Sequence, residues 1–278
     1  MNPKDLVVFV EEEEGRYNRL KFAVSIAEMW KAHVIATFVA SRLELSPHRS
    51  FARGEGLRSM IENHKADVER EEAETRAFFE KLVKNRPVTG EWRFSNNEAG
   101  ESLMLHARHA SLAIVGPSAR VIGPITTLSL SEDIIFASGR PTLMLPTDWP
   151  AERLPKRIVV GWNGGREATR AIAAAMPFLR AAEAVYLVVV PESKVRNLFG
   201  EDPGIDMSRH LARHGVPVVL EQCEGEKVRQ AILERAAYHE ADMLVMGAYS
   251  TPKISEYIFG SVTRTLLEQA EIPLFLSR

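Results

Sequence analysis

The sequence predicts an α/β protein built from two related units, each with a mainly parallel sheet. Three observations support this prediction. The chain has 278 residues, about two domains of the usual size. Short apolar runs alternate with stretches of helical periodicity, and the same series of runs occurs twice. Because strands that alternate with helices indicate βαβ units, right-handed crossovers are expected in each unit.

Nine short apolar runs are predicted to be buried parallel strands. They are rich in β-branched residues and are bounded by polar residues or glycine, as is typical of strands covered on both faces. In the first half they comprise residues 6–10, 34–39, 112–115 and 143–145. In the second half they comprise residues 158–160, 185–190, 216–220, 243–246 and 274–276.

Helices are expected between these strands because apolar side chains recur there at helical spacing. The first half is longer than the second between Ser41 and Trp92. The charged stretch 57–84 in that interval predicts an enlarged helix, interpreted first as a solvated charged helix and alternatively as one that covers a surface of its own half. The other predicted helices are residues 19–31, 100–110, 167–179 and 226–238.

A proline-rich segment separates the two halves. Residues 146–155 contain three prolines in ten positions, which neither a helix interior nor a central strand accommodates. We place the boundary near Ala151. Residues 1–150 then form one predicted domain and residues 151–278 the other.

The charge balance argues against some classes of function. Lys and Arg number 35, Asp and Glu number 37, and the net charge is −2, whereas nucleic-acid-binding proteins usually show a basic excess. No apolar run approaches the roughly 20 residues that a membrane-spanning helix needs. We therefore expect a cytoplasmic protein that binds neither nucleic acid nor membrane.

Residues that commonly bind metals are sparse. Cys223 is the single cysteine, which excludes an intrachain disulfide and a cysteine-based zinc site, so a packing role is expected. Two histidine pairs at helical spacing are interpreted as exposed helix faces rather than metal ligands. They are His106 with His109 and His210 with His214. We predict no catalytic residue and no metal site.

A stretch of the second half has the pattern of a phosphate-binding loop. The strand 243–246 ends at Gly247, a loop follows, and Gly260 with Ser261 opens a predicted helix. The N-terminus of a helix presents unpaired N–H groups and partial positive charge, so it favours phosphate. Ser261 and Thr263 could add hydroxyl donors. The alternative is that glycine and serine only end the loop and cap the helix.

This spacing resembles the nucleotide loop of the universal stress protein family, Gly-x2-Gly-x9-Gly-Ser/Thr. Gly247, Gly260 and Ser261 stand at the expected intervals, and Ser250 replaces the middle glycine. Residues 158–168 resemble the family's first strand and turn, where Asp-Gly-Ser is usual. Residues 270–276 resemble its last strand, which a proline introduces. The first half matches more weakly in the same order, so the chain resembles a tandem member of the family.

The resemblance implies two tandem flavodoxin-like or Rossmann-like domains. Each would have a mainly parallel five-stranded sheet with helices on both faces. The last strands, at residues 142–145 and 274–276, would pair within the chain and form a pseudo-dimer that covers two sheet edges. A homodimer of whole chains is a further expectation.

The resemblance also implies a pocket for an adenine nucleotide, ATP or AMP, with Mg²⁺ accompanying ATP. Ligands of open α/β sheets bind at the carboxyl ends of the strands, which fits this expectation. Asn163 replaces the family's aspartate near the nucleoside, and Val189 or Val190 would lie near the base. The expected lining residues are Trp162, Asn163, Val189, Val190, Gly247, Ser250, Gly260, Ser261, Val262 and Thr263.

The first half is the poorer candidate for such a pocket. Leu128 stands where Gly260 stands in the second half, and Ala119 stands where Ser250 stands. The segment 11–14 consists of four glutamates in place of an Asp-Gly-Ser turn, and it is interpreted as a solvated acidic turn. Each carboxylate–phosphate pair costs about 1 kcal/mol at 4 Å even in water. We therefore expect no ATP in this half.

Three functions remain open on the sequence. The first is a stress-response protein that binds an adenine nucleotide in its second half and is read by a signalling partner. The second is a nucleotide-free scaffold or a binder of another small ligand, which the departures at Ser250 and Asn163 favour. The third is a slow ATPase, which is weaker because no general base can be identified.

Overall fold

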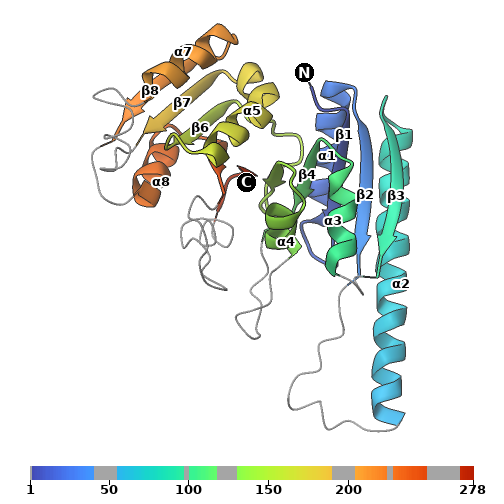
Figure 1. Cartoon of the computed structure of the whole chain (residues 1–278). Helices are drawn as coiled ribbons and strands as arrows, with labels where there is room; N and C mark the ends of the chain where they lie inside the picture. The colour runs from blue at the N-terminus through green and yellow to red at the C-terminus, as the bar shows by residue number, and fades with distance from the viewer. Residues whose placement is uncertain are drawn as a thin grey trace.

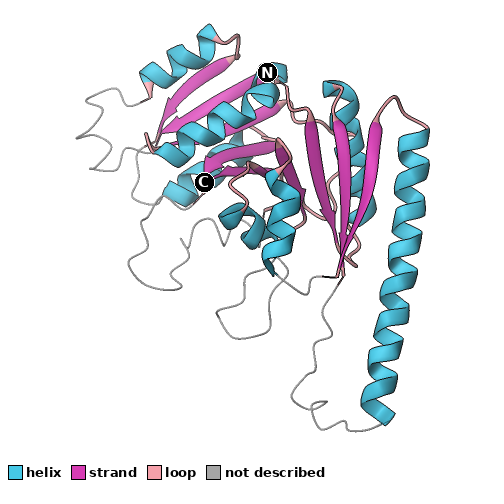
Figure 2. Cartoon of the chain, turned by 45° about the vertical axis from the view of Figure 1, so that its right-hand side comes forward, coloured by secondary structure: helices cyan, strands magenta, loops and turns pink. Residues whose placement is uncertain are grey.

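The computed structural model describes residues 2–40, 55–96, 100–117, 130–189, 204–223, 228–248 and 270–278. Within these ranges the chain forms one ten-stranded sheet with helices on both faces (Figure 1, Figure 2). The predicted α/β class is confirmed. No helix in the described ranges has the length and apolar content that a membrane crossing requires.

Strands and helices alternate along both halves. The N-terminal half comprises β1 (Asp5–Val10), α1 (Arg16–Trp30), β2 (His33–Val39), α2 (Glu55–Lys84), β3 (Thr89–Ser95), α3 (Gly100–Arg108), β4 (Leu112–Val115), α4 (Leu130–Ala137) and β5 (Thr142–Met144). The C-terminal half comprises β6 (Arg157–Trp162), α5 (Arg166–Ala181), β7 (Ala184–Val189), α7 (Ile205–Arg213), β8 (Val218–Gln222), α8 (Val228–Tyr238), β9 (Met243–Gly247) and β10 (Leu274–Ser277).

The strand order is the same in both halves. It reads β3-β2-β1-β4-β5 and then, in reverse, β10-β9-β6-β7-β8. Each half therefore has the order 3-2-1-4-5 of a Rossmann-like sheet rather than the flavodoxin order. Within each half the described strands pair in parallel.

The two halves join through their last strands, as predicted. β5 and β10 pair antiparallel, with Leu143 opposite Phe275. Both strands are buried, so the pairing covers two edges that would otherwise be open to another chain. One continuous sheet results from two five-stranded sheets.

Alternating residues of the strands supply a core on each face. Val8 lies in the core under α1, α2, α5 and α7, whereas Val7 lies in the core under α3, α4 and α8. The first of these cores runs through both halves. At the junction, the ring of Trp30 meets the ring of Phe178 edge-on, with centroids 4.7 Å apart.

Some elements were not predicted from the sequence. β3 forms an edge of the sheet, and its residues are mostly exposed, so it carries no apolar run. α4 and α7 were also missed, and α1 begins at Arg16 rather than Arg19. The short or polar sequences of these segments give little periodic signal.

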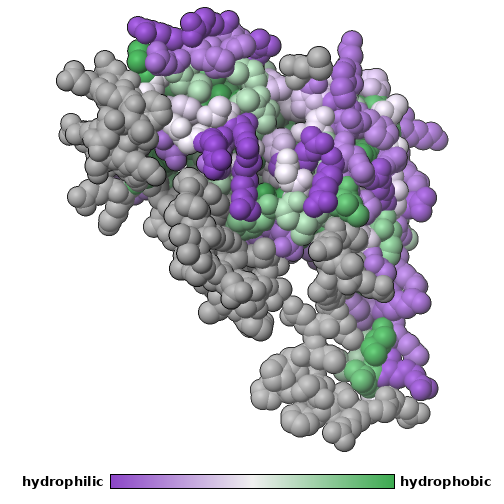
Figure 3. Space-filling view, in the orientation of Figure 1, coloured by the Kyte–Doolittle hydropathy of each residue, from purple (hydrophilic) through white to green (hydrophobic). Residues whose placement is uncertain are grey.

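The predicted enlarged helix of the first half is α2, and it packs on its own half rather than standing as a purely solvated helix. Phe78 packs on Tyr17 of α1 at 4.7 Å, and Phe79 packs on Trp92 of β3 at 5.8 Å. Arg16 of α1 forms an ion pair with Glu71. The N-terminal end of α2 extends beyond the sheet (Figure 1, Figure 2). Hydrophobic residues lie near that end (Figure 3).

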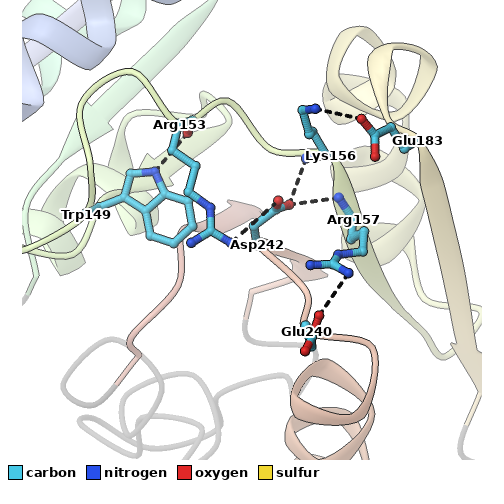
Figure 4. A network of polar contacts seen from close by, with 7 residues as sticks. All are labelled: Trp149, Arg153, Lys156, Arg157, Glu183, Glu240 and Asp242. Atoms are coloured by element: carbon cyan, nitrogen blue, oxygen red, sulfur yellow. Dashed lines mark hydrogen bonds and ion pairs between the residues drawn. The ribbon is translucent and has the colours of Figure 1, made fainter.

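A polar network anchors the segment between the halves to the start of β6 (Figure 4). Asp242, which is 3% exposed, accepts hydrogen bonds from the backbone N–H groups of Lys156 and Arg157 at 2.8 and 2.9 Å. The Trp149 indole donates to the carbonyl of Arg153 at 3.0 Å, and the Arg153 guanidinium lies over that indole. These contacts fix the entry into β6.

Candidate functional site

The candidate site lies where the strand order of the second half reverses. β6 has β7 on one side and β9 on the other, and all three strands run parallel. Their carboxyl ends therefore meet at one edge, the usual ligand position in open α/β sheets. Asn163 follows β6 at this edge, and Gly247 ends β9.

The turn after β6 is closed by its own side chain. The Oδ1 atom of Asn163 accepts a hydrogen bond of 3.0 Å from the N–H of Gly165, which makes an Asx turn. Gly164 has a φ of 71°, a conformation that costs other residues roughly 1 kcal/mol. An aspartate, the residue that the sequence resemblance implies at this position, could accept the same hydrogen bond.

Helix α5 begins directly after this turn. Gly165 is its N-cap in an extended conformation, and no side chain caps the helix. The Thr169 hydroxyl donates to the Gly165 carbonyl at 3.0 Å. The positive end of the helix dipole therefore faces the same edge of the sheet as Asn163.

Gly247 packs against the first turn of α5. A Cβ atom at this position would lie 2.5 Å from the Ala168 nitrogen and 2.8 Å from the Glu167 Cβ. Because the nearest atom belongs to the backbone, no side-chain movement could relieve the overlap. Packing alone thus requires glycine here, in addition to any role in ligand binding.

The other described site residues form an apolar wall. Trp162 and Val189 are partners in the β6–β7 register. The Val189 side chain is fully buried, and a Cβ on Gly204 would lie 2.7 Å from its Cγ2. Gly204, with a φ of 100°, is the N-cap of α7 and was not predicted as part of this wall. Its position depends on tertiary packing, although a glycine before a helix is a recognisable signal.

The remaining predicted site residues lie outside the described ranges: Val190, Ser250, Gly260, Ser261, Val262 and Thr263. No cluster of three or more His, Cys, Asp or Glu side chains suited to a metal occurs in the described part of the chain. Cys223 is buried, and its sulfur accepts a contact of 3.2 Å from Arg235 Nε. Its position is consistent with a packing role.

The two histidine pairs differ in their surroundings. The rings of His210 and His214 meet edge-on at 4.5 Å at the end of α7. Burial lowers the pKa of His106, and the positive charges of Arg93 and His109 lower it further. Among the residues that the structure describes, neither pair belongs to a group of three side chains that could hold a metal ion such as zinc.

The structure corrects the interpretation of the acidic turn in the first half as a solvated turn. Glu11, Glu12 and Glu13 are partly buried rather than fully solvated. Burial raises the pKa of Glu11 to about 7, and the charge of Glu13 contributes. The side chain that accompanies them is Arg19 of α1, which is 1% exposed. Sequence reasoning missed Arg19, although an arginine in a first helical turn opposes the helix dipole and so signals a specific partner.

Comparison with known proteins identifies the second half. The universal stress protein family matches residues 155–278. None of the curated proteins matches the sequence at a significant level. A universal stress protein from Archaeoglobus fulgidus has a similar structure, with a TM-score of 0.71 and 16% identity over 99% of this chain and 98% of its own. A functionally unknown protein from Pseudomonas aeruginosa PAO1 has a TM-score of 0.60 and 14% identity over 99% of this chain and 92% of its own. Residues 155–278, the C-terminal half, therefore match the universal stress protein family, and the chain has over its whole length the fold of a solved universal stress protein.

Proposed function

We propose that this chain is a cytoplasmic stress-response protein whose C-terminal half binds an adenine nucleotide, ATP or AMP. One observation carries the proposal. In the half that the family matches, the Asn163 turn, the N-terminus of α5 and Gly247 meet at the reversal point of the sheet. This is where open α/β sheets bind ligands, and a helix N-terminus favours phosphate.

The proposed roles follow from position. The Asn163 side chain is exposed and uses Oδ1 in its own turn, so its amide nitrogen is the group offered to the nucleoside. Trp162 and Val189, at the ends of β6 and β7, are assigned to the nucleoside, as is Val190, which follows Val189 in the sequence. The phosphates are assigned to Gly247 and to the loop residues Ser250, Gly260, Ser261, Val262 and Thr263. When ATP binds, Mg²⁺ is expected to come with the phosphates.

A titration of the full chain with ATP, AMP and ADP tests the proposal. At 100 times the dissociation constant, a bound nucleotide stabilises the folded state by about 2.7 kcal/mol, which raises the melting temperature. Gly260→Asp should abolish the rise, because it places a carboxylate at the phosphates. Leu128→Asp, at the corresponding position of the first half, is the matched control and should leave it intact. Absence of any rise in the unmodified protein would refute nucleotide binding.

The second candidate function is a nucleotide-free scaffold or a binder of another small ligand. Two observations favour it. Gly247 is required by packing whether or not a ligand binds, and Asn163 Oδ1 is already engaged by Gly165. The same titration separates the two functions, since a scaffold shows no nucleotide-dependent change. Phosphate release that Gly260→Asp abolishes would instead indicate a slow ATPase.

We further propose how the chain is organised for this function. Residues 1–150 and 151–278 are assigned to two domains, with the boundary near Ala151. A signalling partner would read the ligand state at the carboxyl edge of the second half. Because β5 and β10 already cover each other, a homodimer of whole chains would use other surfaces.

A further inference from the structure

Arg19 is a cation buried inside the first half. It stands in the first turn of α1, and only 1% of its surface is exposed. Its Nη1 atom donates a hydrogen bond of 2.8 Å to the carbonyl of Phe9, and it also lies 2.5 Å from the Oε1 atom of Glu13. The guanidinium thus links the end of β1 to the acidic turn that follows it.

Arg19 and Thr169 are corresponding residues of the two halves. The N–H of Arg19 bonds to the Gly15 carbonyl at 3.0 Å, and the N–H of Thr169 bonds to the Gly165 carbonyl at 3.0 Å. Each glycine is the N-cap of the helix that follows the first strand of its half. Thr169 is exposed, whereas Arg19 points inward.

The same comparison shows that Arg19 lies between the end of β4 and the start of α1. Gly247 packs directly on the backbone of the first turn of α5. The corresponding Gly116, at the end of β4, faces the Arg19 guanidinium instead, and a Cβ there would also lie 3.0 Å from Glu13 Oε2. The ion pair therefore lies between the strand end and the helix start, which are in direct contact in the second half.

From this difference we infer that the Arg19–Glu13 pair closes the first half at the position where the second half offers its phosphate site, so that the chain has one such site rather than two. The part of this inference that concerns phosphate rests on the proposed function. The closure itself is a property of the first half alone.

The opposite possibility is that Arg19 attracts an anion. Its Nε and Nη2 atoms are buried without a hydrogen-bond partner among the described residues. Glu13, however, already neutralises the guanidinium at 2.5 Å, and Glu11 lies close enough that the charges of Glu13 and Glu12 help to raise its pKa. The surroundings are therefore net acidic, which opposes phosphate, and closure is the better interpretation.

A double-mutant cycle on the full chain tests the closure without any ligand. The variants are Arg19→Met, Glu13→Gln and the two combined. Arg19→Met leaves the partly buried Glu13 carboxylate without its cation, so the melting temperature should fall by on the order of 5–10 °C. The combined variant should fall by less than the sum of the single changes, because the pair is removed together. Arg58→Met, an exposed arginine of α2, is the control and should change little.

Equilibrium dialysis with inorganic phosphate and with ATP then tests the number of sites. One nucleotide per chain, unchanged in Arg19→Met and lost in Gly260→Asp, supports the inference. Binding that Arg19→Met abolishes while Gly260→Asp retains it would overturn the inference, because Arg19 would then be an anion ligand. If no variant binds either probe, the proposed function fails, and additive melting temperatures in the cycle would still overturn the closure.

Discussion

The indole ring of Trp30 meets the phenyl ring of Phe178 edge-on across the junction of the two halves, at a centroid distance of 4.7 Å. The two residues come from corresponding helices, α1 and α5, and both are almost fully buried. Phe178 also contacts Phe275 of β10 at 5.9 Å. The halves thus share a core as well as a sheet. Each half therefore depends on side chains of the other to bury its apolar residues at the junction.

Phe178→Ala should therefore destabilise the whole chain. Replacing a buried phenylalanine by alanine costs about 3–5 kcal/mol, and here the cavity would open between the halves. Urea denaturation should show a lower midpoint. Tyr238→Ala is the control, because Tyr238 is 74% exposed, and its cost should stay under about 1 kcal/mol. Equal effects of the two substitutions would contradict a shared core.

Gly247→Ala should be costly for a reason that does not involve a ligand. The added methyl group would lie 2.5 Å from the Ala168 nitrogen, so β9 and α5 must move apart. Overpacking of this kind costs about 1–3 kcal/mol. Gly56→Ala is the matched control, since no heavy atom lies within 4 Å of a Cβ there and alanine favours the helix α2. Comparable chemical denaturation midpoints for both variants would refute the packing role.

Asn163→Asp should be tolerated, whereas Asn163→Ala should not. Aspartate can accept the hydrogen bond from the Gly165 N–H, so the free energy of unfolding should change by less than about 0.5 kcal/mol. Alanine removes the acceptor, with an expected loss of about 1 kcal/mol. Thermal denaturation of the three proteins distinguishes these results. A greater loss in the aspartate variant than in the alanine variant would show that the Asx turn does not stabilise the fold.

Glu11 makes the stability depend on pH. Burial raises its pKa from 4.5 to about 7 in the folded chain, with contributions from Glu13 and Glu12 that Arg19 offsets in part. The folded state therefore binds more protons than the unfolded state between these values, and the free energy of unfolding falls as pH rises through them. Above pH 7 the cost is complete.

Glu11→Gln removes this dependence because glutamine stays neutral. At pH 8 the variant should be more stable than the unmodified chain by on the order of 3 kcal/mol, and at pH 4.5 the gain should nearly vanish. Denaturation at both pH values measures the difference. Glu14→Gln, at the exposed neighbouring position, should show no such change between the two pH values. A gain for Glu11→Gln that is independent of pH would exclude titration as the cause.

The predictable part of the fold is carried by local pattern. Buried strands such as β1 and β4 consist of continuous apolar residues, so composition alone identifies them. The pairing of β5 with β10 was also predicted, through the resemblance to a tandem family member, whereas its antiparallel direction comes from the structure. β3 escaped because an edge strand needs no apolar run.

For the candidate site, too, some features follow from local sequence and others only from contacts between distant segments. The sequence by itself determined the α/β class, the internal duplication and the family of the second half, because each depends on periodicity and on residues close together in the chain. Only the tertiary structure decided that Gly247 packs on the α5 backbone and that the Arg19 side chain is buried inside the first half. Those facts depend on which distant segments come into contact. The place of Arg19 in a first helical turn signals a specific partner, but it does not show that the side chain is buried. Its position is fixed by Glu13 and by the Phe9 carbonyl, which compensate the cost of removing the guanidinium from water.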